Sequence, residues 1–220
     1  MGNGGRGFAQ RLMRSPTVSA VYEDWWRPAL GRLAKGLHGP GMAEEHRIAA
    51  ALLGLGPGDV VLDVACGTGA FTRGFARRVA PNGLAIGLDA SPTMLAKAIE
   101  APHDAAGPVA YLRADAEHPP FRPGSLDAVC CFAALHLFDD PETALASFAR
   151  VLSPGGHLAL LTSARRPGLP WRPFDTLVGA VSGMRMFDRG EVTALLRARG
   201  FTDVQAREHG VVQIVGARRR

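Results

Sequence analysis

Three aspartates in the first half of the sequence have the side-chain type and the spacing to bind a small charged ligand. Asp63 precedes the glycine-containing stretch ACGTG (65–69), while Asp89 and Asp115 each follow an apolar run. A carboxylate can accept hydrogen bonds from both hydroxyls of a ribose, and it suits a cationic amino group. The small residues of the stretch let the backbone approach a ligand closely, and the amides of a following helix favour a carboxylate.

Short apolar runs alternate with segments of helical period after about residue 58, which predicts parallel strands joined by helices. We expect strands at 59–64, 84–89, 109–115, 126–135 and 157–163, followed by two strand-like runs in 201–218 that turn at 208–210. The predicted fold is α/β: a doubly wound, mostly parallel seven-stranded sheet with helices on both faces and a C-terminal antiparallel hairpin. Each aspartate then ends one of the first three strands, where open α/β sheets bind ligands.

Local signals set the expected ends of several helices. Ser91 before Pro92, and Asp140 before Pro141, are typical helix starts. PGG (154–156) predicts a turn into the fifth strand. Asp188 and Glu191, three residues apart, predict a capping box for a helix that ends at Gly200.

Five segments carry a stronger signal in combination: VLDVACGTG (61–69), IGLDASPTML (86–95), RADAEHPPF (113–121), SLDAVCCFAALHLFDDP (125–141) and ARVLSPGGHLAL (149–160). Together they resemble the class I S-adenosylmethionine (SAM)-dependent methyltransferases, especially the subgroup with the ubiquinone/menaquinone C-methyltransferases. The resemblance covers residues 58–163. It implies SAM as cofactor, S-adenosylhomocysteine (SAH) as product and cofactor-binding residues Asp63, Ala65, Cys66, Gly67, Thr68, Gly69, Asp89, Ala90, Met94, Asp115, Ala116 and Phe132.

The resemblance also divides these residues by role. The loop after Asp63 is expected to hold the methionine part of SAM and Asp89 the ribose. Met94 is expected to pack on the adenine, whose edge Asp115 and Ala116 would read. Ala65 stands where the family has its first glycine.

Methyl transfer from a sulfonium is an in-line displacement, so positioning and exclusion of water supply most of the catalysis. The expected acceptor is a small molecule that is methylated at oxygen, carbon or nitrogen. His136, after the fourth strand, is the candidate general base if the acceptor is a phenol, a hydroxyl or an acidic carbon. The alternative is a histidine that packs the loop.

The acceptor pocket is expected outside the repeating strand–helix pattern. Its candidates are Tyr22, Trp26, His46, Trp171 and Phe174, although aromatic residues at helical spacing also suit a core. The expected organisation is a flexible arm (1–14), an N-terminal helical cap (15–57) and a SAM-binding Rossmann-like methyltransferase domain (58–220). Residues 164–187 form a predicted lid or insertion within that domain.

The sequence bears differently on three alternative functions. A NAD(P)-dependent oxidoreductase would show GxGxxG, whereas this loop has AxGxG after an aspartate. A nucleic-acid methyltransferase of exocyclic amines would carry an Asn/Asp-Pro-Pro-aromatic motif after the fourth strand, where FAALHLF stands. A non-catalytic SAM-binding protein conflicts with nothing in the sequence and stays open.

Composition sets the remaining expectations. The 220 residues, 47% of them hydrophobic, suit one domain, and the net charge of +5 is scattered apart from a terminal ARRR. No nucleic-acid partner and no membrane contact are therefore expected, and no signal sequence or long apolar run is seen, which predicts a cytoplasmic protein. The three cysteines suit neither disulfides nor a metal site, so no metal is expected. The oligomeric state is left open.

Overall fold

A computed structural model describes residues 41–102, 107–166, 168 and 184–220. Its centre is a seven-stranded sheet in the order β3-β2-β1-β4-β5-β7-β6. The strands are β1 (Val60–Val64), β2 (Leu84–Asp89), β3 (Val109–Arg113), β4 (Leu126–Phe132), β5 (Leu152–Ser163), β6 (Phe201–His209) and β7 (Val212–Arg219). β1 to β5 pair in parallel, and β7 pairs antiparallel with both β5 and β6. The predicted doubly wound sheet with its C-terminal hairpin is confirmed.

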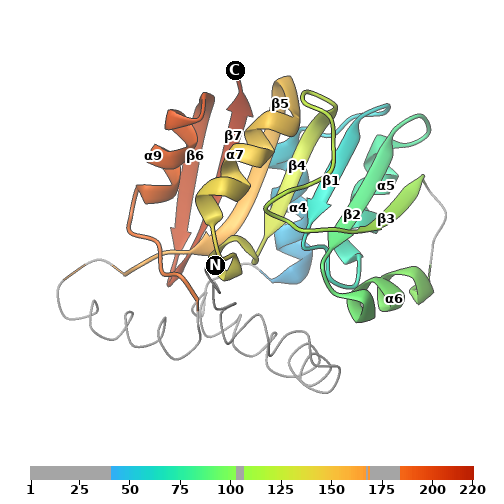
Figure 1. The fold of residues 1–220 in the computed structure, drawn as a ribbon, viewed down its shortest axis with the longest axis horizontal. Coiled ribbons are helices and arrows are strands. Elements are labelled where there is room, and N and C mark those ends of the chain that lie inside the picture. Colours follow the sequence, from blue (N-terminus) through green and yellow to red (C-terminus); the bar gives the residue numbers. More distant parts are fainter. Residues whose placement is uncertain (1–40, 103–106, 167, 169–183) are drawn as a thin grey trace, which may run out of the picture.

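Helices cover both faces of the sheet. They are α4 (Met42–Leu53), α5 (Ala70–Val79), α6 (Pro92–Glu100), the short 3-10 helix η2 (Leu135–Leu137), α7 (Pro141–Val151) and α9 (Glu191–Ala198). One apolar core packs α4 and α5 against the sheet, and the other packs α7 and α9 against its opposite face. In Figure 1, α7 crosses in front of the sheet and α4 lies behind it. β4 is buried from both sides, as its continuous apolar run predicts.

Two helix starts form as their sequences predict. The Ser91 hydroxyl accepts a hydrogen bond from the Met94 amide at 3.3 Å, with Pro92 in the first turn of α6. One oxygen of the Asp140 carboxylate accepts the amides of Glu142 and Thr143 at 3.0 and 3.1 Å, which caps α7. These bonds, with one from the Thr143 hydroxyl, lower the pKa of Asp140.

Two local predictions were wrong. PGG (154–156) does not precede β5 as a turn, because β5 already begins at Leu152. Leu152 pairs with Leu126 and His157 with Ala128, so the residues between them form a bulge inside the strand. The start of α9 also differs, because its N-cap is Gly190 rather than Asp188. One bond of the predicted capping box is present, because the Asp188 amide donates to the Glu191 carboxylate at 2.7 Å.

The segments outside the core repeat are described in part. The helix expected near 43–53 is α4, whereas the one expected at 17–37 lies outside the described residues. Of the predicted insertion, the described part includes residues 184–187, where Phe187 is completely buried in the core. Among the described residues, no helix combines the length and the apolar character that crossing a membrane requires.

Candidate functional site

The first part of the candidate site is a buried carboxylate at the end of β1. Asp63 is only 3% exposed, and its Oδ2 accepts a hydrogen bond of 2.6 Å from the hydroxyl of Thr72 in α5. A buried carboxylate is costly unless hydrogen bonds or a cation compensate for the lost water. The hydrogen bond from Thr72 therefore holds the Asp63 side chain in place at the base of the loop that follows. Thr72 is not among the residues that the sequence predicts, because its contact with Asp63 depends on how α5 packs on β1.

The loop after β1 is compact because its backbone turns through the left-handed region. Ala65, Gly67 and Gly69 have φ values of 55, 55 and 73°. The Gly69 amide donates to the Cys66 carbonyl at 3.0 Å, which closes the turn, and the Cys66 amide donates to the Leu88 carbonyl at 3.0 Å. Alanine is strained in this region where glycine is not, so Ala65 is an unfavourable residue that the surrounding bonds hold in place.

Asp89 joins this loop to β2. Its Oδ2 accepts the amide of Gly67 at 2.9 Å, and its Oδ1 accepts the amide of Ser91 at 2.8 Å. Hydrogen bonds to a charged acceptor are stronger than those between neutral groups. The carboxylate is half-buried and so remains accessible to a ligand at the carboxyl edge of the sheet. Of the predicted cofactor residues, Asp89, Gly67 and the rest of the loop thus form one connected group.

The carboxylate after β3 bonds to its own segment, whereas Asp89 bonds to the loop after β1. The Asp115 carboxylate is exposed and accepts the amide of Glu117 at 2.9 Å, with His118 Nδ1 at 3.7 Å. A backbone bond of 3.3 Å from Ala114 to the Asp89 carbonyl brings the start of this segment beside β2. Met94 is buried in the first turn of α6, Ala116 is half-buried and Ala90 is exposed. Asp115 therefore lies at the predicted edge, but its side chain bonds within its own loop.

An aromatic group lies between α4, α5 and the end of β4. The His46 ring meets Phe71 edge-on at 3.8 Å between centroids, and Phe71 lies 5.3 Å from Phe132. The buried His46 Nε2 has no hydrogen-bond partner among the described residues. Burial, and secondly the charge of Arg77, lowers the pKa of His46. Two predicted residues, His46 and Phe132, are thus connected through Phe71, which was not predicted.

His136 lies in η2, directly beyond β4. Its Nδ1 is 3.4 Å from the hydroxyl of Thr162 on β5, and burial lowers its pKa to about 4. The imidazole is therefore neutral near pH 7, and its conjugate acid is strong. The backbone carbonyl of His136 accepts a hydrogen bond from the Arg185 amide at 2.8 Å. This bond fixes η2 to the chain that returns from the predicted insertion.

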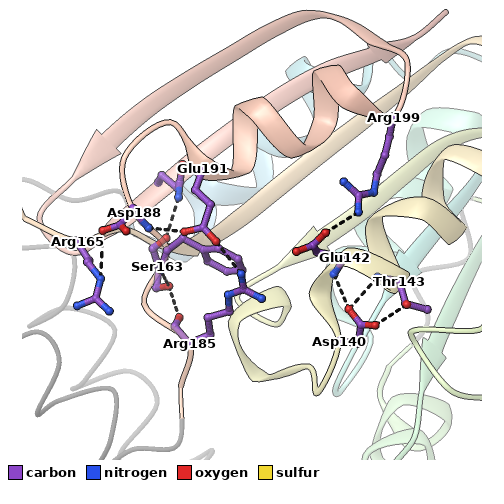
Figure 2. A network of polar contacts seen from close by, with 11 residues as sticks. Asp140, Glu142, Thr143, Ser163, Arg165, Arg185, Asp188, Glu191 and Arg199 are labelled. Carbon is purple, nitrogen blue, oxygen red and sulfur yellow. Dashed lines mark hydrogen bonds and ion pairs between the residues drawn. The ribbon is translucent and has the colours of Figure 1, made fainter.

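Figure 2 shows how that returning chain is held. The hydroxyl of Ser163, the last residue of β5, donates to the Arg185 carbonyl at 2.6 Å. The Arg185 side chain pairs with Glu191 of α9 at 2.7 Å, and its guanidinium lies 5.0 Å from the centre of the Phe187 ring. Four segments therefore meet at Arg185: η2, β5, the 184–187 chain and α9. The remaining predicted pocket residues lie outside the described residues: Tyr22, Trp26, Trp171 and Phe174.

The chemistry that these groups allow is binding and positioning. Burial, with the charges of Asp63 and Asp89, raises the pKa of the Cys66 thiol, so this cysteine stays protonated rather than acting as a nucleophile. No group of three or more histidine, cysteine or acidic side chains that could hold a metal ion occurs in the part of the chain that the structure describes. The site instead offers carboxylates, backbone amides of the α5 start and a neutral imidazole.

Comparison with known proteins gives consistent matches. The pattern of the methyltransferase-domain family matches residues 62–160. An uncharacterized chloroplastic methyltransferase of Arabidopsis thaliana is 37% identical over 202 residues, covering 88% of this chain and 55% of that protein. A ubiquinone/menaquinone biosynthesis C-methyltransferase of Ectopseudomonas mendocina is 40% identical over 126 residues, covering 56% and 49%. The chain thus spans about half the length of these two relatives.

Among solved structures, a SAM-dependent methyltransferase from Aquifex aeolicus superposes with a TM-score of 0.61 at 22% identity. The superposition covers 79% of this chain and 89% of that one. At this identity the likeness shows the fold alone.

Proposed function

We propose that this chain, whose residues 62–160 match the methyltransferase-domain family, transfers a methyl group from SAM to a small-molecule acceptor. The observation that carries the proposal is the bonded unit at the carboxyl ends of β1 and β2. There Asp89 holds the Gly67 amide at 2.9 Å while Asp63 lies buried beneath the same loop. A carboxylate at each of two adjacent strand ends suits a ligand with both hydroxyls and a cationic amino group.

The charges and hydrogen-bonding groups of these residues support SAM as the ligand. The loop 65–69 and the start of α5 would hold its methionine part, with Asp63 near the ammonium group. Asp89 would accept the ribose hydroxyls, Met94 would pack on the adenine, and Asp115 with Ala116 would contact the adenine edge. When bound, SAM supplies an electrophilic methyl group on a sulfonium.

The acceptor is proposed to bind beyond β4 and β5. His136 is neutral near pH 7 because burial lowers its pKa to about 4, so it can accept a hydrogen bond from an acceptor hydroxyl. A base this weak orients the acceptor more effectively than it removes a proton. Phe71 and Phe132 supply an apolar wall on the other side of β4, with His46 beside them. These residues would position the acceptor and exclude water.

The remaining parts of the proposal follow from the sequence. The acceptor is a small molecule that is methylated at oxygen, carbon or nitrogen, and neither a nucleic acid nor a membrane is a partner. The division into arm (1–14), helical cap (15–57) and catalytic domain (58–220), with a lid at 164–187, belongs to the same proposal. So does a cytoplasmic location, although the Arabidopsis thaliana relative is described as chloroplastic.

A labelling experiment tests this function. The protein is incubated with methyl-labelled SAM and a metabolite extract, and the small-molecule, protein and nucleic-acid fractions are separated. We expect label in a small molecule, and at least tenfold less label with Asp89→Asn. The proposal is contradicted if the label appears only in macromolecules, or if SAH binds and no fraction gains label. The second result would favour a SAM-binding protein without transferase activity.

A further inference from the structure

We infer that Tyr111 and Arg73 are positioning residues that support the cofactor loop. The inference rests on the proposed function, in which the loop 65–69 holds the methionine part of SAM. Neither residue belongs to the predicted site. Their contacts show how a loop with three left-handed residues is kept at a fixed height above the sheet.

Tyr111 reaches the loop by passing over β2. In the parallel register, Tyr111 on β3 pairs with Gly87 on β2, and Gly87 pairs with Asp63 on β1. Residues in register on neighbouring strands share a face of the sheet. Gly87 has no side chain, and a Cβ there would lie 2.7 Å from Tyr111 Cδ1 and 2.9 Å from Cys66 Sγ. The tyrosine ring therefore fills the space above Gly87 and reaches the first residues of the loop.

The far end of the ring supports Gly69. A Cβ at Gly69 would collide with the Tyr111 hydroxyl and would lie 2.8 and 2.9 Å from ring atoms Cε1 and Cζ. Real Cβ atoms essentially never come this close to a neighbour. Glycine is thus required at position 69 for two reasons: its φ of 73° is left-handed, and a side chain would collide with Tyr111. Two glycines, Gly87 on β2 and Gly69 in the loop before α5, therefore contact one tyrosine.

Arg73 completes the support. It lies one turn into α5, and its Nη1 donates to the Thr68 carbonyl at 2.9 Å. The same nitrogen lies 3.3 Å from the Tyr111 hydroxyl and 3.3 Å from the Ala98 carbonyl on α6. One guanidinium therefore links the loop, β3 and α6. Burial raises the pKa of Tyr111, so its hydroxyl stays protonated and accepts through a lone pair.

The consequence concerns ligand affinity. The loop is tied through the Gly67 amide to Asp89 at 2.9 Å, and separately through the Thr68 carbonyl to Arg73 at 2.9 Å. Loss of Arg73 or of the tyrosine hydroxyl would leave the first tie intact. The loop would then sample more conformations, and binding would have to restrict them again. The affinity for the methionine part should fall while contacts to the adenosine part persist.

Calorimetric titration of four full-length proteins tests the inference: wild type, Arg73→Met, Tyr111→Phe and the double variant. Each is titrated with SAH and with 5′-methylthioadenosine, which lacks the amino-acid tail. We expect the Kd for SAH to rise about tenfold in Arg73→Met and about threefold in Tyr111→Phe. The Kd for methylthioadenosine should change less than twofold. Because the two side chains share one hydrogen bond, the Kd of the double variant for SAH should rise no more than about tenfold.

The control is Arg78→Met, which removes an exposed arginine from the same helix and should bind both ligands like wild type. Arg73→Lys, which keeps a cation but cannot reach several acceptors at once, should fall between wild type and Arg73→Met and serves if that variant unfolds. An SAH Kd within twofold of wild type in Arg73→Met, equal losses for both ligands, or fully additive losses would each overturn the inference. If wild type and Arg78→Met also fail to bind SAH, the proposed function itself is wrong.

Discussion

The two halves of the carboxyl edge are held together in different ways. At the ends of β1 and β2, neighbouring segments bond directly, with the Asp89 carboxylate accepting the Gly67 and Ser91 amides at 2.9 and 2.8 Å. At the ends of β4 and β5, segments distant in sequence meet, with the Arg185 amide bonded to the His136 carbonyl at 2.8 Å. A local motif thus determines the first half, whereas tertiary contacts determine the second. We expect substitutions in the first half to change cofactor binding and those in the second half to change transfer.

A pair of glycines gives the largest expected difference. Gly69 and Gly190 are both left-handed N-cap residues, with φ of 73 and 78°, on the first and second half respectively. Gly69→Ala should lower the free energy of unfolding by about 3–4 kcal/mol, from backbone strain together with the collision with Tyr111. Gly190→Ala should lose only about 1 kcal/mol, because nothing lies within 4 Å of its Cβ position. Urea unfolding measures both values.

One outcome of the two glycine substitutions would contradict the role of Tyr111. Equal losses of unfolding free energy in the two variants would mean that Tyr111 does not restrict Gly69. The matched backbone geometry removes strain as an explanation, since both positions have the same left-handed conformation.

Asp89→Asn should have the next largest effect. The amide side chain keeps the shape but loses the charge that two backbone amides and the ribose would share, so the Kd for SAH should rise about 10- to 100-fold. Asp203→Asn is the matched control, since this exposed aspartate on β6 lies at the far edge of the sheet and has φ of 52°, which asparagine tolerates. Titration calorimetry with SAH measures both. Similar Kd values for the two variants would remove Asp89 from the cofactor site.

His136 tests the second half through pH. Burial lowers its pKa from 6.5 to about 4, so between these values the unfolded chain binds a proton that the folded chain does not. Stability should therefore fall as the pH decreases from 6.5 to 4, and His136→Asn should lose less stability over that range, by on the order of 2 kcal/mol. His118→Asn, which removes an exposed imidazole, is the control. SAH affinity should stay within twofold in both variants.

The same variant also tests whether His136 is buried and whether it lies in the acceptor half. If His136→Asn loses stability with acid as steeply as wild type, the imidazole is not buried as described. If it weakens SAH binding tenfold, His136 belongs to the cofactor half rather than to the acceptor half.

The smallest expected effect concerns two ion pairs of similar exposure. Glu191→Gln breaks the pair with Arg185, and Glu208→Gln breaks the pair with Arg189. Each should cost about 0.5–1 kcal/mol of stability, as partly exposed ion pairs do. Only Glu191→Gln should also slow labelled methyl transfer, by about two- to threefold, because Arg185 is bonded to the His136 carbonyl. Equal transfer rates in the two variants would separate Arg185 from the acceptor half.

The same division explains what the sequence could predict. Alternating apolar runs and the caps at Ser91 and Asp140 are local signals, and the strands and helices that they predict are present. The bulge at 153–156 was missed because glycines that suit a turn also suit a bulge, and only the pairing with β4 distinguishes the two.

The site follows the same rule. The loop 65–69 and Asp89 could be predicted because spacing alone brings adjacent strand ends together. Tyr111 could not, because its contact with Gly69 crosses β2 and depends on the missing side chain of Gly87. The lowered pKa of His136 depends on burial by segments distant in sequence, which no local pattern reports.

Hydrogen–deuterium exchange with and without SAH tests the central claim most directly. If the cofactor binds at the carboxyl ends of β1 and β2, SAH should slow exchange in peptides that cover 65–72 and 89–95. Peptides from β6 and β7 should exchange at unchanged rates. Unchanged exchange at 65–72 and 89–95 under saturating SAH, or protection confined to another region, would contradict the account.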